Sequence, residues 1–186
     1  MEQLLKWDSE LFIFLNSLGQ ESWDPIWLLI SGTKTWIPFY LFLLFLVFKK
    51  FDLKIFGIAF LILILNTVFT DTGSVWLFKE QFQRLRPCHV PDLLENMRLV
   101  KESCGGKYGF VSSHASNTFG LAVLMGGILK EHYSKSVGLL LFWSSLVALS
   151  RVYLGVHYPL DIICGAIYGA FCGYLSLRIF RKITIK

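Results

Sequence analysis

The chain has 186 residues, of which 54% are hydrophobic and only 17% are charged. Soluble domains average about 45–50% apolar and about 25% charged residues, so the composition excludes an ordinary soluble protein and indicates an integral membrane protein. The net charge of +5 is modest, and the basic residues flank apolar segments, so we expect the bilayer as a partner and no nucleic acid. The length allows one domain, and we expect residues 1–186 to form a single membrane domain.

The first expected element is an amphipathic helix within residues 1–20. Its charged positions, Lys6, Asp8 and Glu10, are set among leucine and phenylalanine residues. A helix of this kind lies in the plane of the membrane interface. We therefore predict an interfacial helix at the N-terminus.

Five apolar segments follow this helix. The first, residues 23–48, is interrupted by Ser31, Gly32, Thr33 and Lys34, and we interpret it as one broken span. The other expected spans cover residues 55–78, 114–129, 137–154 and 159–179. Since a membrane helix needs about 20 apolar residues, the predicted fold class is all-α, a polytopic membrane bundle of about five to six transmembrane helices.

The last span carries a stripe of small residues. Gly165, Gly169 and Gly173 recur every four residues and so share one face of the helix. Such a stripe lets a neighbouring helix approach closely, and we interpret it as a packing surface.

Three short polar clusters stand at the ends of these apolar segments. They are residues 79–87 (KEQFQRLRP), 112–114 (SSH) and 150–161 (SRVYLGVHYPLD). The ends alternate along the chain, so all three clusters meet on one face if the segments cross the membrane up and down. Charges beside a bilayer are costly and mark functional sites, so this convergence predicts an anion site.

The remaining basic residues predict the orientation. Those at the opposite ends of the segments are Lys49, Lys50, Lys54, Lys130, Lys135, Arg178, Arg181, Lys182 and Lys186. By the positive-inside rule these ends face the cytoplasm. This orientation places the polar clusters outside the cytoplasm. The location that we expect is a bacterial inner membrane, with the clusters on the periplasmic or outer face.

The clusters contain groups suited to binding phosphate. Lys79, Arg86 and Arg151 supply fixed cations, and a guanidinium can bind two phosphate oxygens at once. Ser112 and Ser113 stand where the third span begins, so their hydroxyl and N–H groups can join the helix dipole in holding an anion.

The clusters also contain groups suited to phosphoryl transfer. His157 and Asp161 are four residues apart at the start of the last span and so lie on one face. The carboxylate can take one ring N–H, which leaves the other ring nitrogen free to attack phosphorus. His114, from another segment, can protonate the leaving oxygen.

The chain here resembles the type 2 phosphatidic acid phosphatases, a family related to the vanadium haloperoxidases. The family pattern K-x6-R-P is met by Lys79, Arg86 and Pro87. The pattern S-R-x5-H-x3-D is met by Ser150, Arg151, His157 and Asp161. The pattern P-S-G-H is met in part, by Ser112 and His114, with Val111 and Ser113 in place of its proline and glycine. The resemblance covers residues 54–180, which we expect to be the catalytic core.

The resemblance implies an integral membrane, metal-independent phosphatase with no cofactor. His157 would be the nucleophile that forms a phosphohistidine, Asp161 its orienting partner and His114 the general acid. The phosphate would be bound by Lys79, Arg86, Ser112, Ser113 and Arg151. The family acts on lipid phosphates or diphosphates, so candidate substrates are undecaprenyl diphosphate, phosphatidylglycerophosphate, phosphatidate and a lipid A phosphate.

Other functions use the same groups. A small membrane anion transporter or channel could use the cationic cluster, and it would release no phosphate in detergent. A vanadium-dependent peroxidase shares the site pattern, but the apolar spans disfavour it. His114 and His157 could also ligate a metal ion, although the surrounding cations would repel one.

Two further features accompany the motifs. If the clusters face an oxidising compartment, a disulfide between Cys88 and Cys104 is chemically permitted, and it would hold Arg86 and His114 on a common base. Asp71, within the second span, is either a functional carboxylate or a structural partner of a nearby cation or hydroxyl.

Overall fold

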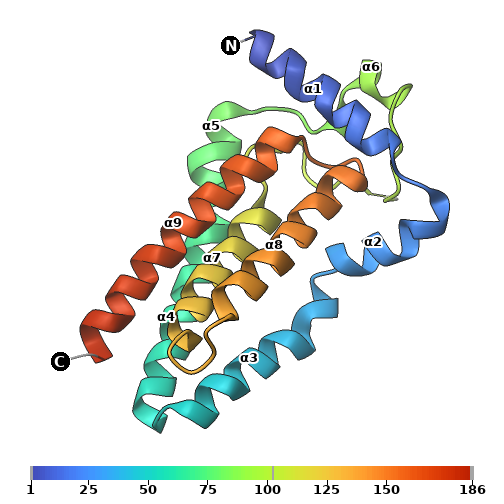
Figure 1. The fold of residues 1–186 in the computed structure, drawn as a ribbon. Coiled ribbons are helices and arrows are strands. Elements are labelled where there is room, and N and C mark those ends of the chain that lie inside the picture. Colours follow the sequence, from blue (N-terminus) through green and yellow to red (C-terminus); the bar gives the residue numbers. More distant parts are fainter. Residues whose placement is uncertain (1, 102, 185–186) are drawn as a thin grey trace.

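The computed structural model describes residues 2–101 and 103–184, and within these ranges it contains helices and turns but no β-strand (Figure 1). The all-α class expected from the sequence is confirmed. Lys186, one of the basic residues used for the orientation, lies outside the described residues.

Helix α1 (Glu2–Ser17) lies across one end of the bundle, over the ends of α8 (Ser136–Tyr153) and α9 (Pro159–Thr184) (Figure 1). It buries Asp8, Phe12 and Asn16, which follow one another at intervals of four residues. Most of its other large apolar residues, such as Trp7 and Phe14, are exposed. Two of its polar residues, Asp8 and Asn16, therefore face the protein and hydrogen-bond to other elements, whereas Lys6 and Glu10 are exposed.

The expected break in the first span is present. A short 3-10 helix (Glu21–Trp23) leads into α2 (Asp24–Ser31), and a second one (Lys34–Trp36) leads into α3 (Ile37–Lys50). The two halves are bent by 64°. The indole N–H of Trp36 donates to the carbonyl of Ile30 at 2.8 Å and so holds the two sides of the break together.

Helix α4 (Leu53–Gly73) runs on through a π-helical turn (Ser74–Lys79) into α5 (Glu80–Phe82). The sequence predicted a helix end at Phe78 and a polar loop from residue 79. Lys79 instead lies within a continuous helical segment, which ends at Gln83 with a left-handed backbone (φ 47°). A π turn is uncommon and is found mostly at functional sites. The rest of the connection contains a 3-10 turn (Pro87–His89) and the short α6 (Pro91–Leu94).

Helix α7 (Ser113–Leu129) is the central helix, and α4, α8 (Ser136–Tyr153) and α9 (Pro159–Thr184) pack around it. The small-residue stripe of α9 forms the tightest of these contacts. Gly165, Gly169 and Gly173 lie against the backbone carbonyls of Ser112, Ser116 and Gly120, where any added Cβ atom would collide. The interpretation of this stripe as a packing surface is therefore confirmed.

Within residues 2–101 and 103–184, three helical segments are long and apolar enough to cross a membrane: Leu53–Phe82, Ser136–Tyr153 and Pro159–Thr184. The bent pair Glu21–Ser31 and Lys34–Lys50 passes the same test as one broken span. Helix α7, enclosed among them, has 17 residues, at the lower limit of about 17 for a membrane helix. The five to six spans expected from the sequence stay a prediction, which would have to count the bent pair as one broken span and α7 as a short one.

The three polar clusters meet at one end of the bundle. The end of the α4–α5 segment, the start of α7, the end of α8 and the start of α9 all lie there, beneath α1 (Figure 1). The basic ends of α3, α4 and α9 and the α7–α8 connection lie at the other end. The candidate site residues therefore lie at one end of the helix bundle, and the basic residues of the helix ends lie at the opposite end.

Candidate active site

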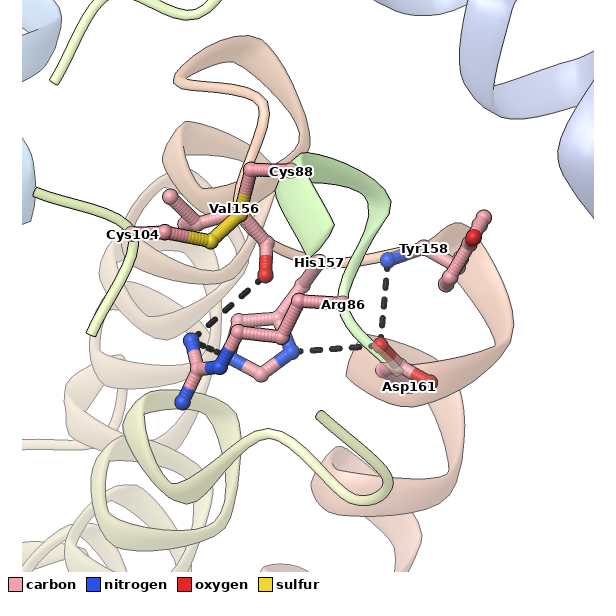
Figure 2. Close-up of a disulfide and its surroundings, with 7 residues drawn as sticks. All are labelled: Arg86, Cys88, Cys104, Val156, His157, Tyr158 and Asp161. Carbon is pink, nitrogen blue, oxygen red and sulfur yellow. Dashed lines mark hydrogen bonds and ion pairs between the residues drawn. A yellow bond between two sulfur atoms is a disulfide. The ribbon is translucent and has the colours of Figure 1, made fainter. Parts of the chain in front are cut away.

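His157 lies in the short connection between α8 and α9 and is only 2% exposed. Its Nδ1 is 3.2 Å from Oδ2 of Asp161, and Nη1 of Arg86 is 3.1 Å from its Nε2 (Figure 2). A guanidinium can only donate hydrogen bonds, so Nε2 accepts from Arg86 and Nδ1 carries the ring proton that it donates to Asp161. The unprotonated nitrogen is therefore Nε2.

Asp161 is held by three donors. Its Oδ2 accepts from His157 and from the backbone N–H of Tyr158, the latter at 3.1 Å (Figure 2). Its Oδ1 accepts from Nη1 of Arg84, also at 3.1 Å. The carboxylate is fully buried, and these contacts fix its orientation toward the imidazole.

The imidazole of His157 is held in its neutral form. Burial lowers its pKa well below the ordinary value, and the nearby cations Arg86, Arg151, Lys79 and Arg84 lower it further. Each of these effects opposes a positive charge on the ring. The lone pair on Nε2 is therefore available to a nucleophilic reaction at neutral pH.

A cavity of about 730 Å³ opens beside His157. Its polar end is lined by Lys79, Arg86, Ser113, His114, Arg151 and His157. Apolar side chains from the 3-10 helix Lys34–Trp36 and from α3, α4, α7 and α8 form much of its remaining wall: Trp36, Tyr40, Leu63, Ile64, Val68, Leu121 and Val147. The cavity therefore combines an anion-binding end with a surface suited to a hydrocarbon chain.

The cations at the polar end are pre-arranged by serine hydroxyls. The ammonium group of Lys79 donates to Oγ of Ser113, which also lies 2.6 Å from Oγ of Ser74 in the π-helical turn. Arg151 donates through Nη1 to Oγ of Ser31 at the break between α2 and α3. The broken span thus supplies a contact to the site.

Two guanidinium N–H groups at this end are buried without a partner. Among the described residues, Nε of Arg86 and Nε of Arg151 have no hydrogen-bond acceptor. Buried donors left unpaired are costly. A phosphate oxygen between the two side chains would satisfy them.

Ser112 does not reach the cavity wall. It is fully buried, and its backbone N–H donates to the carbonyl of Asp161 at 3.0 Å. Of the two serines predicted to bind phosphate, the structure therefore brings Ser113 to the cavity, while Ser112 joins the starts of α7 and α9.

Asp71 lines the cavity and accepts a hydrogen bond from the side-chain amide of Asn117 at 3.0 Å. Both interpretations of this carboxylate stay open. In residues 2–101 and 103–184, no group of three His, Cys, Asp or Glu side chains is placed to hold a metal ion.

Cys88 and Cys104 are joined as a disulfide, with their Cα atoms 6.1 Å apart (Figure 2). Cys88 follows Arg86 by two residues, and Cys104 and Gly105 line the cavity. Gly105 has a left-handed backbone (φ 82°), and a Cβ atom there would lie 3.8 Å from the Arg86 guanidinium. The bridge therefore ties the segment that carries Arg86 to the rim of the cavity.

Sequence reasoning missed several polar residues around the site. Arg84 and Asp8 form an ion pair at 2.6 Å beside Asp161. Lys101 lines the cavity, and its pKa is lowered by burial and by repulsion from Arg151 and Arg86. The signal for Asp8 was its spacing of four from Phe12 and eight from Asn16, whereas nothing in the local sequence of Lys101 indicated a role.

The model of the PAP2 superfamily matches residues 55–185 of this chain. The chain belongs to the PAP2 superfamily. It is 30% identical over 181 residues to a lipid A 4'-phosphatase of Bacteroides thetaiotaomicron, covering 96% of this chain and 79% of the relative. It is 34% identical over 184 residues to a lipid A 4'-phosphatase of Porphyromonas gingivalis, covering 97% and 75%.

Two solved structures share the fold of this PAP2 protein. The PAP2-type phosphatidylglycerolphosphate phosphatase from Bacillus subtilis superposes with a TM-score of 0.72 at 20% identity, covering 100% of this chain and 90% of the other. Aquifex aeolicus LpxE superposes with a TM-score of 0.64 at 24% identity, covering 91% and 93%. With the family match and the relatives, the chain is a membrane lipid phosphatase of the PAP2 type, which disfavours the transporter and peroxidase alternatives.

Proposed function

We propose that this phosphatase removes a phosphate group from a lipid A-type phosphate monoester through a phosphohistidine on His157. The observation that carries the proposal is the hydrogen bonding of the imidazole. The Asp161 carboxylate accepts a hydrogen bond from the protonated Nδ1 of His157. The unprotonated Nε2 points toward Arg86 at the cationic end of the cavity.

In the first step, Nε2 of His157 forms a bond to phosphorus while the bond from phosphorus to the lipid oxygen breaks. His114, on the cavity wall, becomes protonated when the anionic phosphate offsets the nearby cations, and it gives this proton to that oxygen, so the lipid leaves as an alcohol. The charge that spreads over the phosphoryl oxygens is neutralised by Lys79, Arg86 and Arg151. Asp161 stabilises the positive charge that develops on the ring.

In the second step, neutral His114 takes a proton from a water molecule, and the resulting hydroxide forms a bond to phosphorus. The bond between phosphorus and Nε2 breaks, and its electron pair returns to the ring. Inorganic phosphate is released, and both histidines regain their starting protonation states.

The choice of lipid rests on the relatives and on the cavity. The two relatives that match nearly the whole chain are named lipid A 4'-phosphatases. The apolar walls beside the cationic end supply a surface for an acyl chain. A lipid whose phosphate group lies close to its acyl chains would place the phosphate at the cationic end and a chain along the apolar walls.

We also propose that the cavity opens on the outer, periplasmic face of a bacterial cytoplasmic membrane. The basic ends of the helices lie at the opposite end of the bundle, in agreement with the positive-inside rule. The Cys88–Cys104 disulfide beside the cavity supports the same orientation, since disulfides persist in oxidising compartments.

The test is a phosphate-release panel with purified protein in detergent and chelator. The substrates are lipid A, undecaprenyl diphosphate, phosphatidylglycerophosphate and phosphatidate, and His157→Asn is the control. We expect the highest kcat/KM on lipid A and none above background in the variant. A tenfold preference for another lipid would overturn the substrate class, and release by His157→Asn would overturn the mechanism.

A further inference from the structure

We propose that Arg84 and Asp8 are positioning residues for the phosphatase reaction: Arg84 aims the Asp161 carboxylate at His157, and Asp8 anchors Arg84. Helix α1 is then a functional part of the catalytic unit. The inference rests on the proposed role of His157 as the nucleophile.

The Arg84 guanidinium bridges two carboxylates. Its Nη1 donates to Oδ1 of Asp161 at 3.1 Å, and its Nη2 donates to Oδ2 of Asp8 at 2.6 Å. Its Cζ atom also lies over the ring of Tyr158, 3.8 Å from the ring centroid. With two anions and an aromatic face around it, Arg84 has little freedom to point elsewhere.

The second carboxylate oxygen of Asp8 is also held by a hydrogen bond. Oδ1 accepts the backbone N–H of Leu160 at 2.8 Å, in the first turn of α9 and one residue before Asp161. The carboxylate is 6% exposed. Asp8 therefore contacts both Arg84, which holds the Asp161 side chain, and the first turn of α9, which carries Asp161.

If Arg84 is removed, no other side chain that the structure describes takes its place as the hydrogen-bond donor to Oδ1 of Asp161. Oδ2 of Asp161 is shared by His157 and the Tyr158 N–H, whereas Oδ1 has Arg84 as its hydrogen-bond donor. Without Arg84, Oδ1 would be a buried anionic oxygen with no donor, which favours rotation or protonation of the carboxyl group. Either change would weaken the hydrogen bond that holds Nδ1 of His157.

Helix α1 has a second anchor that does not reach the site. The amide of Asn16 donates to the carbonyls of Arg98, Val152 and Tyr153 and accepts from the Arg98 N–H at 2.6 Å. Asn16 lies on the same face as Asp8 and is equally buried. A variant at Asn16 therefore loosens α1 while leaving the path from Asp8 through Arg84 to Asp161 in place.

The test compares kcat and KM for p-nitrophenyl phosphate in detergent, together with the unfolding midpoint, among Arg84→Gln, Arg84→Lys, Asp8→Asn and Asn16→Ala. We expect Arg84→Gln and Asp8→Asn to lower kcat about 10–100-fold, as for other residues that orient a reacting group, with KM changed less than about threefold. Arg84→Lys should recover part of the lost kcat. Asn16→Ala should lower the midpoint with kcat close to that of the wild type.

A second criterion is coupling. Because both residues act through Asp161, the double variant Asp8→Asn/Arg84→Gln should lose little more than Arg84→Gln alone. If Arg84→Gln fails to fold, Asp8→Asn, which keeps the side-chain shape, decides by the same kcat criterion.

The inference is overturned if Arg84→Gln and Asp8→Asn keep kcat within threefold of the wild type. It is also overturned if Asn16→Ala loses as much kcat as they do. Failure of the proposed function looks different, because His157→Asn would then retain turnover. A dead His157→Asn variant beside an active Arg84→Gln variant would reject only the positioning role.

Discussion

The guanidinium of Arg86 covers the ring nitrogen of His157 that faces the cavity, with Nη1 3.1 Å from Nε2. The same Nη1 also reaches the carbonyl of Val156 at 3.5 Å, so Arg86 is held by protein acceptors on one side (Figure 2). A phosphate that enters the cavity offers anionic oxygens in place of a neutral nitrogen. Arg86 can then exchange Nε2 for a phosphate oxygen, which frees the nucleophile as the substrate binds.

This exchange predicts that Arg86→Lys raises KM more than it lowers kcat. Lysine keeps the charge but loses the planar pair of donors, and a hydrogen bond to a charged group contributes about 1.5–3 kcal/mol. We expect KM for p-nitrophenyl phosphate to rise about 10–100-fold. Lys107→Ala is the matched control, since Lys107 is exposed on the same connection and does not line the cavity. An unchanged KM in Arg86→Lys would contradict the exchange.

His114→Ala should show a loss that depends on the leaving group. A lipid alkoxide needs a proton to leave, whereas p-nitrophenolate does not, and general acid catalysis contributes about 10²–10⁴-fold. We therefore expect a large drop in kcat on a lipid phosphate and a much smaller drop on p-nitrophenyl phosphate. His132→Ala is the control, because His132 packs on Phe51 at the opposite end of the bundle. Equal losses on the two substrates would reject His114 as the general acid.

The Cys88–Cys104 bridge should be present in protein extracted without thiols. Closing a loop with a sequence separation of 16 contributes about 3 kcal/mol in the chain-entropy model, and the bridge also steadies Arg86. We expect a cross-linked peptide in non-reduced mass spectrometry, and a raised KM in the Cys88→Ser/Cys104→Ser variant. Cys164 and Cys172 are free thiols and serve as the internal control for alkylation. Alkylation of Cys88 and Cys104 without reductant would rule the bridge out.

The neutral state of His157 predicts how stability depends on pH. Its pKa in the folded protein is held well below the ordinary value by burial and by Arg86, Arg151, Lys79 and Arg84. The unfolded chain has the ordinary value of about 6.5. Below that pH His157 is protonated in the unfolded chain but stays neutral in the folded protein. Its contribution to the free energy of unfolding is therefore fully present above about pH 6.5 and is lost as the pH falls.

The loss corresponds to about 1.4 kcal/mol per pH unit for one proton. We expect the apparent unfolding midpoint in detergent to fall between pH 6.5 and pH 5. The same scan of His157→Asn should fall less steeply, because the titrating group is gone. Identical slopes for the two proteins would contradict the neutral buried imidazole.

Much of the site could be predicted from the sequence, because its groups lie at the ends of strongly apolar segments. The alternation of those ends was enough to place Lys79, Arg86, His114, Arg151 and His157 around one cavity. The predicted contact between His157 and Asp161 is present, but its reason was wrong, because His157 lies in the connection before α9 and not on a face of that helix. Both predictions rest on residues that are close together in the sequence or at the ends of apolar segments, and these can be recognised without knowledge of distant contacts.

The parts that depend on distant contacts could not be predicted. Arg84 and Asp8 are separated by 76 residues, and although the pattern K-x6-R-P indicated Arg86 for the cavity, nothing in the sequence indicated a partner for Arg84. The charged residues of α1 looked like the water-facing side of an interfacial helix, yet Asp8 is buried against α9. The π turn that carries Lys79 was missed as well, since its wider hydrogen-bond pattern leaves no mark in the hydrophobic periodicity.

The most direct test of the account is to trap the covalent intermediate. Purified protein is mixed with a radiolabelled phosphate ester, quenched within one turnover and digested under alkaline conditions, which preserve phosphohistidine. We predict label on the peptide that contains His157, lost on acid treatment and absent from His157→Asn. Label that is stable to acid and lies on Ser113, or label that persists in His157→Asn, would contradict nucleophilic attack by His157.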